Sequence, residues 1–267
     1  MVLEGAELLS VAMAAGVSIE AVYVAPEGAT TPAVVEVTRR ILSQGGRVFD
    51  LAAGVMERVA STVTPQPLLA VVSYTSTPLD TLDGTTLVVV CVDVRDPGNL
   101  GTVIRTADAA GVDAVICCDG TVDPTNPKCV RATAGSLFHL PVVDGGTLAA
   151  TVADLSARGF KTVATVVRGG TDYATFDWTG PVALVLGNEA GGLPHDLVAS
   201  LDAGVTIPMA GRSESLNVSV SAAVLCFEAL RQRRTPRSPR PPAGRSTMSA
   251  MDEVAKRPDD DGSGVTA

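Results

Sequence analysis

Residues 87–105 read LVVVCVDVRDPGNLGTVIR, an apolar run that leads into a glycine-containing turn and then into a helical pattern. The consecutive apolar residues from Leu87 to Val92 are typical of a strand that is buried on both faces. Gly98 permits close backbone approach, and Asn99 is placed to cap the helix that we expect over 101–110. This order of strand, turn and helix predicts an α/β sheet with a ligand site at the carboxyl end of the strand.

Similar apolar runs recur along the chain and extend this unit into a sheet. We expect further strands over 114–118, 162–167, 182–186 and 205–208. Helical patterns separate most of them, over 101–110, 147–158 and 216–232. The alternation predicts an open, mostly parallel sheet, and the dominance of aliphatic residues over aromatic ones agrees with it.

Residues 1–75 carry a smaller α/β pattern of their own. We expect helices over 4–15, 32–44 and 56–60, and strands over 21–25, 47–49 and 68–73. Residues 74–84 carry turn chemistry and few core-forming side chains, which indicates a linker. The stretch from Thr235 is rich in Pro, Arg, Ser and Asp and lacks apolar periodicity, which predicts disorder. The predicted parts are 1–75, a linker at 76–84, a main domain at 85–232 and a disordered tail at 233–267.

Charge restricts the classes of function. Residues 1–230 hold 12 Lys and Arg against 24 Asp and Glu, a balance of −12, whereas residues 231–267 hold 8 against 5, a balance of +3. An acidic body binds nucleic acid poorly unless it carries a local basic surface, because neutralisation of phosphates supplies most of that affinity. Net charge alone therefore favours an enzyme that acts on a small molecule.

The cysteines and the apolar runs restrict location and metal content. The five cysteines form no C-x-x-C pair, so buried, reduced thiols are favoured over a zinc site and we expect no metal. No apolar run is long enough to span a bilayer, and the first residues lack a basic segment of the kind that opens a signal peptide. We therefore expect a soluble, cytoplasmic protein that does not associate with membranes.

The turn at residues 93–105 is the first segment that suggests chemistry. Free N–H groups at the start of a helix attract anions, and Arg105 in the second turn can face the same crevice. By itself, the segment fits an ordinary capped helix with a surface cation. It does not fit a dinucleotide fingerprint, because Gly98 and Gly101 are spaced G-x-x-G.

A second glycine-rich turn follows the strand expected over 182–186. Residues 184–193 read LVLGNEAGGL, which places Gly187, Glu189 and Gly192 directly after buried apolar residues. Glycine backbone at the end of a strand accepts a nucleoside in close contact. A carboxylate at the sheet edge needs a partner, and Arg105 is the candidate. A tight turn with an exposed glutamate is the alternative.

The third segment precedes the last helix. Residues 206–220 read TIPMAGRSESLNVSV, and we expect Ser215 to cap the helix with Asn217 in its first turn. The apolar stripe of this amphipathic helix then consists of Leu216, Val220, Val224 and Phe227. Such a helix accounts for Ser215 as a cap and for Leu216 as an apolar residue, so neither requires a function. It does not account for the polar residues at the start of the helix together with the preceding Ile-Pro-Met.

Taken in order, the three segments resemble the motifs of the SpoU branch of the SPOUT methyltransferases, the TrmH-like RNA 2′-O-ribose methyltransferases. The matching motifs are N-x-G-x-x-x-R at 99–105, G-x-E-x-x-G at 187–192, and I-P-M with S-L-N at 207–217. The resemblance is close over residues 85–230. Residues 1–75 resemble the family's small ribosomal-protein-like domain, which binds the RNA substrate, in Leu3-Glu4-Gly5 and Thr62-Val63-Thr64-Pro65-Gln66.

This resemblance implies a SPOUT α/β trefoil knot, in which the C-terminal segment threads through a loop, and a homodimer with its active site near the interface. It implies transfer of a methyl group from S-adenosylmethionine to a ribose 2′-hydroxyl. The implied cofactor-binding residues are Leu186, Gly187, Gly192, Ile207, Met209 and Leu216. The implied catalytic residues are Asn99, Arg105, Glu189, Ser215 and Asn217. Arg105 is the implied base, but a guanidinium stays protonated near neutral pH, so binding a phosphate or the developing alkoxide is its alternative role.

RNA is the implied partner, and 23S rRNA is the expected substrate. A tRNA 2′-O-methyltransferase and a non-catalytic RNA-binding paralogue are the alternatives. Residues 126–136 match a family segment near the RNA, which implies that Lys128, Arg131 and Ser136 bind RNA, although solvated cations are the ordinary explanation. The basic stretch 231–245 either adds to this surface or is incidental. Members often carry a basic extension before the Leu-x-Glu-Gly pattern, so we expect either an upstream start or weaker RNA binding here.

Overall fold

The computed structural model describes residues 1–60 and 62–234. Residues Met1–Arg234 form one compact unit. The predicted disordered tail lies outside the described residues, except that Arg233 and Arg234 still belong to the last helix. In the described part of the chain, no helix is long and apolar enough to cross a membrane.

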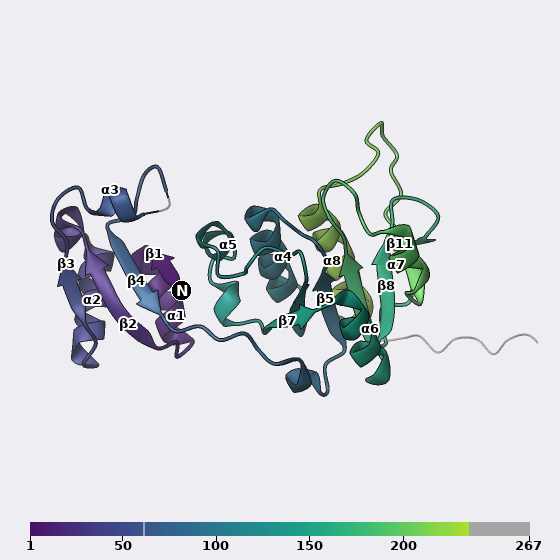
Figure 1. Ribbon diagram of the computed structural model, residues 1–267, viewed down its shortest axis with the longest axis horizontal. Coiled ribbons are helices and arrows are strands. Elements are labelled where there is room, and N and C mark those ends of the chain that lie inside the picture. Colours follow the sequence, from purple (N-terminus) through teal and green to yellow (C-terminus); the bar gives the residue numbers. More distant parts are fainter. Residues whose placement is uncertain (61, 235–267) are drawn as a thin grey trace, which may run out of the picture. The chain divides into compact units, whose positions relative to one another are not determined.

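The main sheet has seven parallel strands in the order β7-β6-β5-β10-β8-β11-β9, as Figure 1 shows in part. Its strands are β5 (Leu87–Cys91), β6 (Ala114–Cys118), β7 (Val142–Gly146), β8 (Lys161–Thr165), β9 (Thr171–Asp172), β10 (Val182–Leu186) and β11 (Ala203–Thr206). The predicted parallel α/β sheet is confirmed. Strands β7 and β9 were not predicted, because β7 ends in Asp-Gly-Gly and β9 has only two residues.

Strand β5 lies between β10 and β6, and its side chains pack on both faces of the sheet. Leu87, Val89 and Cys91 belong to one buried cluster, whereas Val88 and Val90 belong to another. Helices α4 (Pro97–Ala109) and α8 (Val218–Arg234) contribute to the first cluster, and α6 (Leu148–Ala157) contributes to the second. The run of apolar residues in this strand therefore reflects burial on two sides, as predicted.

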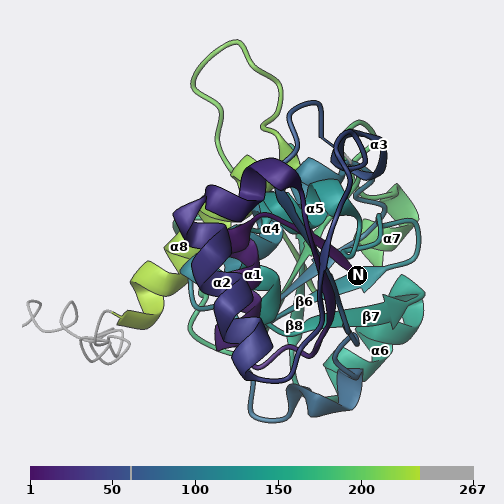
Figure 2. The same cartoon turned by 90° about the vertical axis from the view of Figure 1, so that its left-hand side faces the viewer.

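The N-terminal residues form a separate four-stranded sheet in the order β1-β4-β2-β3. Its elements are β1 (Val2–Glu4), α1 (Ala6–Ala14), β2 (Ile19–Val24), α2 (Pro32–Ser43), β3 (Val48–Asp50), α3 (Met56–Val59) and β4 (Leu68–Val72), and Figure 2 shows α1 and α2 side by side. The Glu4 carboxylate accepts hydrogen bonds from the Thr62 hydroxyl at 2.5 Å and the Gln66 N–H at 3.0 Å. The two short N-terminal motifs, Leu3-Glu4-Gly5 and Thr62–Gln66, are thus in direct contact.

The segment predicted to be a linker packs on the main sheet. Residues Leu79–Leu82 form a 3₁₀ turn, and Leu82 is buried among the residues of the second cluster. Asp83 accepts a hydrogen bond from Arg158 at the end of α6. Leu82 therefore serves as a core residue and Leu79 packs beside it, which the polar composition of this segment concealed.

The last helix begins later than expected. Helix α8 starts at Val218 rather than Leu216, and the side chain of Asn217 accepts a hydrogen bond from the Ser219 N–H at 2.8 Å. Asn217 therefore caps the helix, and the prediction of Ser215 as the cap is wrong. The predicted stripe is also not the buried one, since Val220 and Phe227 are 46% and 48% exposed. The buried side chains of α8 are Val218, Ser219, Ala222, Leu225, Cys226 and Ala229.

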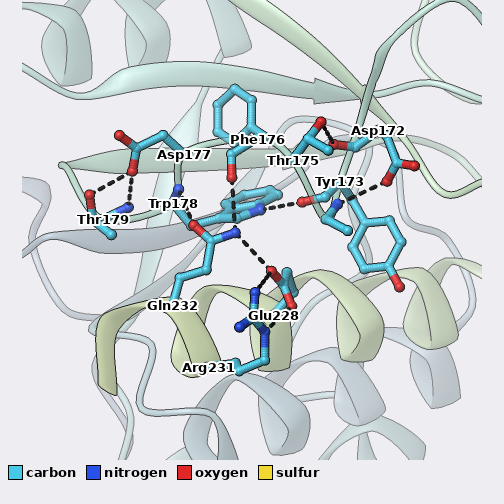
Figure 3. Close-up of polar contacts among 11 residues, drawn as sticks. Asp172, Tyr173, Thr175, Phe176, Asp177, Trp178, Thr179, Glu228, Arg231 and Gln232 are labelled. Atoms are coloured by element: carbon cyan, nitrogen blue, oxygen red, sulfur yellow. Dashed lines mark hydrogen bonds and ion pairs between the residues drawn. The ribbon is translucent and has the colours of Figure 1, made fainter. Parts of the chain in front are cut away.

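Polar contacts fix the far end of α8. Figure 3 shows the Gln232 side chain between the helix and the loop that follows β9, where it donates to the Phe176 carbonyl and accepts from the Trp178 N–H. Arg233 donates to the carbonyls of Trp178, Thr86 and Gly180. Thr86 and Gly180 precede β5 and β10, so α8 ends at the amino-terminal edge of the main sheet. Its first turn consequently lies at the carboxyl-terminal edge.

The remaining helices are α5 (Pro127–Ala132) and α7 (His195–Ala199), and neither was predicted. Both are short, so neither shows helical periodicity in the sequence. All five cysteines are buried and unpaired, which confirms the prediction made from their spacing.

Candidate active site

Side chains from three separate loops meet at the carboxyl ends of β5, β10 and β11. The Asn217 amide donates to the Asn99 side-chain oxygen at 3.0 Å, and the Asn99 amide donates to the Glu189 carboxylate at 3.0 Å. Strands β5 and β10 are neighbours in the sheet. After β5 the chain continues to β6 on one side, whereas after β10 it continues to β11 on the other side. This is the position at which open α/β sheets form ligand sites.

The turn after β5 is ordered by a different residue from the one predicted. Asp96 is the cap of α4, since its side chain accepts a hydrogen bond from the Asn99 N–H at 2.9 Å. Asn99 lies inside the first helical turn, so the prediction that it caps the helix is wrong. Lys128 donates to the same Asp96 carboxylate at 2.8 Å, and this contact lowers the pKa of Asp96. The side chain of Asn99 is therefore free to join Glu189 to Asn217.

Glu189 binds the turn after β5 and not Arg105. Its carboxylate accepts from Asn99 and from the backbone N–H groups of Asp96 at 3.2 Å and Arg95 at 3.4 Å. Burial alone would raise the pKa of Glu189, but the hydrogen bonds outweigh it and the pKa is lowered. Arg105 is exposed, and its side chain forms no hydrogen bond or ion pair with any described residue. The predicted pairing of Glu189 with Arg105 is wrong.

A cavity of about 210 Å³ lies beside this group of contacts. Glu189 and Ser215 line it, and so do five of the six predicted cofactor residues, namely Gly187, Gly192, Ile207, Met209 and Leu216. Leu186 is fully buried within β10 and does not line the cavity. The cavity wall also includes two carboxylates, Glu189 and Glu214, and no cation among its described lining residues.

One side of the cavity requires glycine. A Cβ atom at Gly187 would lie 2.5 Å from the Gly192 carbonyl carbon and 2.6 Å from the Leu193 nitrogen, both of which are backbone atoms. Gly192 has a φ of +63°, in the left-handed region that disfavours side chains. The Asn188 side chain closes the loop by accepting from the N–H groups of Ala190 and Gly191. The glycines of this segment therefore build a backbone wall for a ligand.

Several residues that line the cavity were not predicted. Thr165, Val166 and Val167 come from the carboxyl end of β8, and Ser221 and Leu225 come from α8. The carboxyl end of the strand expected over 162–167 was the available signal, because neighbouring parallel strands end at one edge of the sheet.

The three residues predicted to bind RNA lie in different environments. Lys128 is exposed but paired with Asp96. Arg131 lies 3.6 Å from the Glu4 carboxylate, and its side chain is 32% exposed. Ser136 is almost fully buried. Binding of RNA by this group of residues stays a prediction.

A model of the SpoU rRNA Methylase family matches residues 86–227. A curated relative from Bacillus subtilis, the 23S rRNA (guanosine(2553)-2′-O)-methyltransferase RlmP, is 40% identical over 186 residues, which are 70% of this chain and 73% of the relative. The sequence comparison therefore extends beyond the three motifs and covers the whole main sheet.

Two solved structures resemble the chain over most of its length. The AdoMet-bound rRNA methyltransferase from Sinorhizobium meliloti has a TM-score of 0.75 and 35% identity, and covers 86% of each chain. The SpoU methyltransferase AviRb from Streptomyces viridochromogenes, in complex with AdoMet, has a TM-score of 0.80 and 29% identity, and the match covers 89% of this chain and 91% of AviRb. The likeness thus includes the N-terminal sheet as well as the main one.

Proposed function

We propose, from the premise that this chain belongs to the SpoU rRNA methylase family, that it transfers a methyl group from S-adenosylmethionine to a ribose 2′-hydroxyl of RNA. The observation that carries this proposal is the contact from Asn217 through Asn99 to Glu189 beside the glycine-walled cavity. Because the B. subtilis relative is named for 23S rRNA, we propose large-subunit rRNA as the substrate. Transfer RNA is the alternative class.

The cavity suits S-adenosylmethionine, which when bound supplies an activated methyl group on a sulfonium. This cofactor carries positive charge on its sulfonium and its ammonium groups, and the described lining offers Glu189 and Glu214 without a competing cation. Apolar walls from Ile207, Leu216 and Leu225 suit the faces of an adenine. The close backbone at Gly187 lets the ligand approach the sheet edge.

Glu189 acts in this proposal as an organiser and not as the proton acceptor. Its carboxylate already accepts three hydrogen bonds, and its lowered pKa makes it a weak base. Asn99 and Asn217 keep the loops of β5 and β11 together around the acceptor hydroxyl. Ser215 lines the cavity next to them and is proposed to contact the substrate or cofactor.

Arg105 is proposed to act on the RNA from the solvent side. It is exposed on α4, in the helix that carries Asn99, and no described residue neutralises it. A guanidinium remains protonated near neutral pH, so we assign Arg105 to hold a phosphate or the developing negative charge on the ribose oxygen. Removal of this side chain is expected to leave the cofactor cavity intact.

The protein is proposed to act as a homodimer through α8. The face formed by Val220, Val224 and Phe227 is apolar, yet Val220 and Phe227 are about half exposed while the opposite side of the helix is buried. A helix with two apolar sides requires a second partner. Helices α4 and α8 pack against each other, which places Asn99, Arg105 and this face in one layer. The proposed interface therefore adjoins the site.

The division of labour along the chain is proposed from the same resemblance. Residues 1–75 would bind the RNA substrate, residues 85–232 would form the catalytic domain, and residues 76–84 would link the two. The C-terminal segment of the catalytic domain would be knotted around the cofactor. The loop from β11 to α8 supports the knot, because β11 lies beyond β8 in the sheet while α8 packs on α4. A ribosomal substrate is consistent with a cytoplasmic location.

One experiment separates the candidate activities. The purified protein is incubated with labelled S-adenosylmethionine and with unmodified 23S rRNA or tRNA, and 2′-O-methyl positions are mapped. Labelling at one site in 23S rRNA is expected. Labelling of tRNA alone would instead assign the tRNA activity, and cofactor binding without transfer to either RNA would assign a non-catalytic RNA-binding role.

A further inference from the structure

The entrance of the candidate site is crowded with negative charge. Asp93, Asp96 and Glu189 surround the turn after β5, and Glu214 lines the adjoining cavity. Lys128 is paired with Asp96, so its charge is largely balanced. An RNA substrate brings a phosphate on each side of the target ribose, and these phosphates require a cation at the entrance.

Arg95 has the geometry for this task. Its side chain is 73% exposed, and its Nε donates to the Asp93 carboxylate at 2.7 Å. Its backbone N–H donates to Glu189, which ties the residue to the contacts of Asn99. The two terminal nitrogens of Arg95 form no hydrogen bond with the described residues. The guanidinium is therefore held at one edge and presents its other edge to solvent.

The residue that holds Arg95 is itself fixed in an unusual conformation. Asp93 has a φ of 56°, and in the described part of the chain only one other non-glycine residue, Ala134, has a positive φ. The Asn188 side chain donates to the Asp93 carbonyl at 2.9 Å and thereby ties the turn after β5 to the glycine-rich loop. Conformations of this kind persist where surrounding contacts enforce them, and they concentrate at functional sites. The Asp93 carboxylate that accepts the hydrogen bond from Arg95 therefore belongs to a turn fixed from both sides.

We propose that Arg95 binds a phosphate of the RNA next to the target ribose, through the two terminal nitrogens that Asp93 leaves unused. This inference rests on the proposed function and adds a substrate-binding residue to it. A guanidinium fork matches the oxygens of a phosphate, whereas a lysine ammonium is a point charge on a flexible stem. The adjacent contacts of Glu189 and Asn99 place this fork beside the catalytic group.

Arg158 provides a matched comparison within the same chain. Its Nε also donates to an aspartate, Asp154, at 2.7 Å, but its terminal nitrogens are engaged by Asp83 and Asp154. It follows α6 and precedes β8, so it lies at the amino-terminal edge of the sheet, opposite the site. Substitution of either arginine by glutamine removes the same charge, but only the substitution of Arg95 should affect RNA.

The test measures RNA affinity at several salt concentrations, using the 23S rRNA fragment that the wild-type protein methylates, together with calorimetric titration of S-adenosylmethionine. Arg95→Gln is expected to weaken RNA binding roughly five- to tenfold at about 0.1 M salt and to reduce the slope of log affinity against log salt by about 0.7, the value of one phosphate contact to a single strand. Arg95→Lys should keep the wild-type slope because it keeps the charge. Arg158→Gln should keep both affinity and slope.

Two outcomes would overturn the inference. RNA affinity and salt slope of Arg95→Gln equal to those of the wild type would show that Arg95 does not contact phosphate. Loss of S-adenosylmethionine binding in the same variant would show that the residue supports the fold of the site. The proposed function fails in a different way, namely when the wild-type protein binds the cofactor and transfers no methyl group to RNA.

Discussion

The amide of Asn217 lies 3.0 Å from the side-chain oxygen of Asn99, although 118 positions separate the two residues in the chain. The same Asn217 side chain caps α8 with its oxygen, and the same Asn99 side chain binds Glu189 with its nitrogen. Each asparagine thus uses both ends of its amide, one as donor and one as acceptor. A substitution that removes one end therefore separates the structural role from the catalytic one.

Asn217→Asp keeps the oxygen that caps α8 but removes the donor to Asn99. We expect an unchanged melting temperature and a fall in the rate of methyl transfer of tenfold or more, because Asn99 loses the hydrogen bond that orients it towards Glu189. Asn217→Ala removes the cap as well and should cost about 1 kcal/mol of stability in addition. Thermal unfolding and single-turnover transfer assays measure the two effects. Equal rates for the wild type and Asn217→Asp would contradict the assigned role.

Glu189→Gln should make the stability of the protein less dependent on pH. The pKa of Glu189 is lowered from its ordinary value of 4.5 in the folded protein, so its ionised form stabilises the fold at neutral pH. That stabilisation is present above about pH 4.5 and is lost as the pH falls through the folded pKa. The difference in unfolding free energy between the wild type and the variant should therefore shrink below about pH 4.5. A difference that grows in acid would contradict this reading.

Gly187→Ala should abolish binding of S-adenosylmethionine, because the new Cβ would meet backbone atoms of Gly192 and Leu193 at 2.5 to 2.6 Å and neither can give way without moving the loop. Gly180→Ala, just before the same strand, is the control, since apart from its two chain neighbours no described residue has an atom within 4 Å of the added Cβ. Calorimetric titration of the cofactor measures both variants. Wild-type affinity in Gly187→Ala would show that the cavity does not depend on this close contact.

Val220→Glu should convert the proposed dimer to a monomer. A charge on the exposed apolar face of α8 cannot be buried against a second copy without a large desolvation cost. Leu42→Glu introduces the same charge at an exposed apolar residue of α2, where no effect on assembly is expected. Light scattering after size-exclusion chromatography gives the mass of each variant. A wild-type protein that is monomeric at every concentration would refute the dimer.

Arg105→Ala should abolish methyl transfer while binding of S-adenosylmethionine survives, because the side chain is exposed and does not line the cavity. Parallel transfer assays and cofactor titrations check this expectation. Loss of cofactor affinity in a folded Arg105→Ala protein would count against a role on the RNA.

The sequence predicted the main sheet well, because strands that are buried on both faces appear as unbroken apolar runs such as Leu87–Cys91. The predictions from the sequence were wrong where several neighbouring residues could take the same role. Asn99, Ser215 and Asn217 are all suitable helix caps, yet Asp96 and Asn217 fill these positions. The missed signal for Asp96 was the proline that follows it, because proline is favoured at the first position of a helix. The exposed side of α8 could not be distinguished from its buried side, since Val220 and Phe227 are as apolar as Leu225.

The anchorage of Arg233 to the carbonyls of Thr86 and Gly180 has a practical consequence for work with this protein. Helix α8 has 17 residues and spans about 25 Å, so Arg234 lies that far from the loops around Asn217. A fluorophore, affinity handle or surface tether attached to the side chain at position 234 would thus sit at the opposite edge of the sheet from the reaction. Protein immobilised through this end of α8 is expected to turn over RNA at the same rate as protein free in solution, which makes position 234 suitable for attachment in single-molecule measurements.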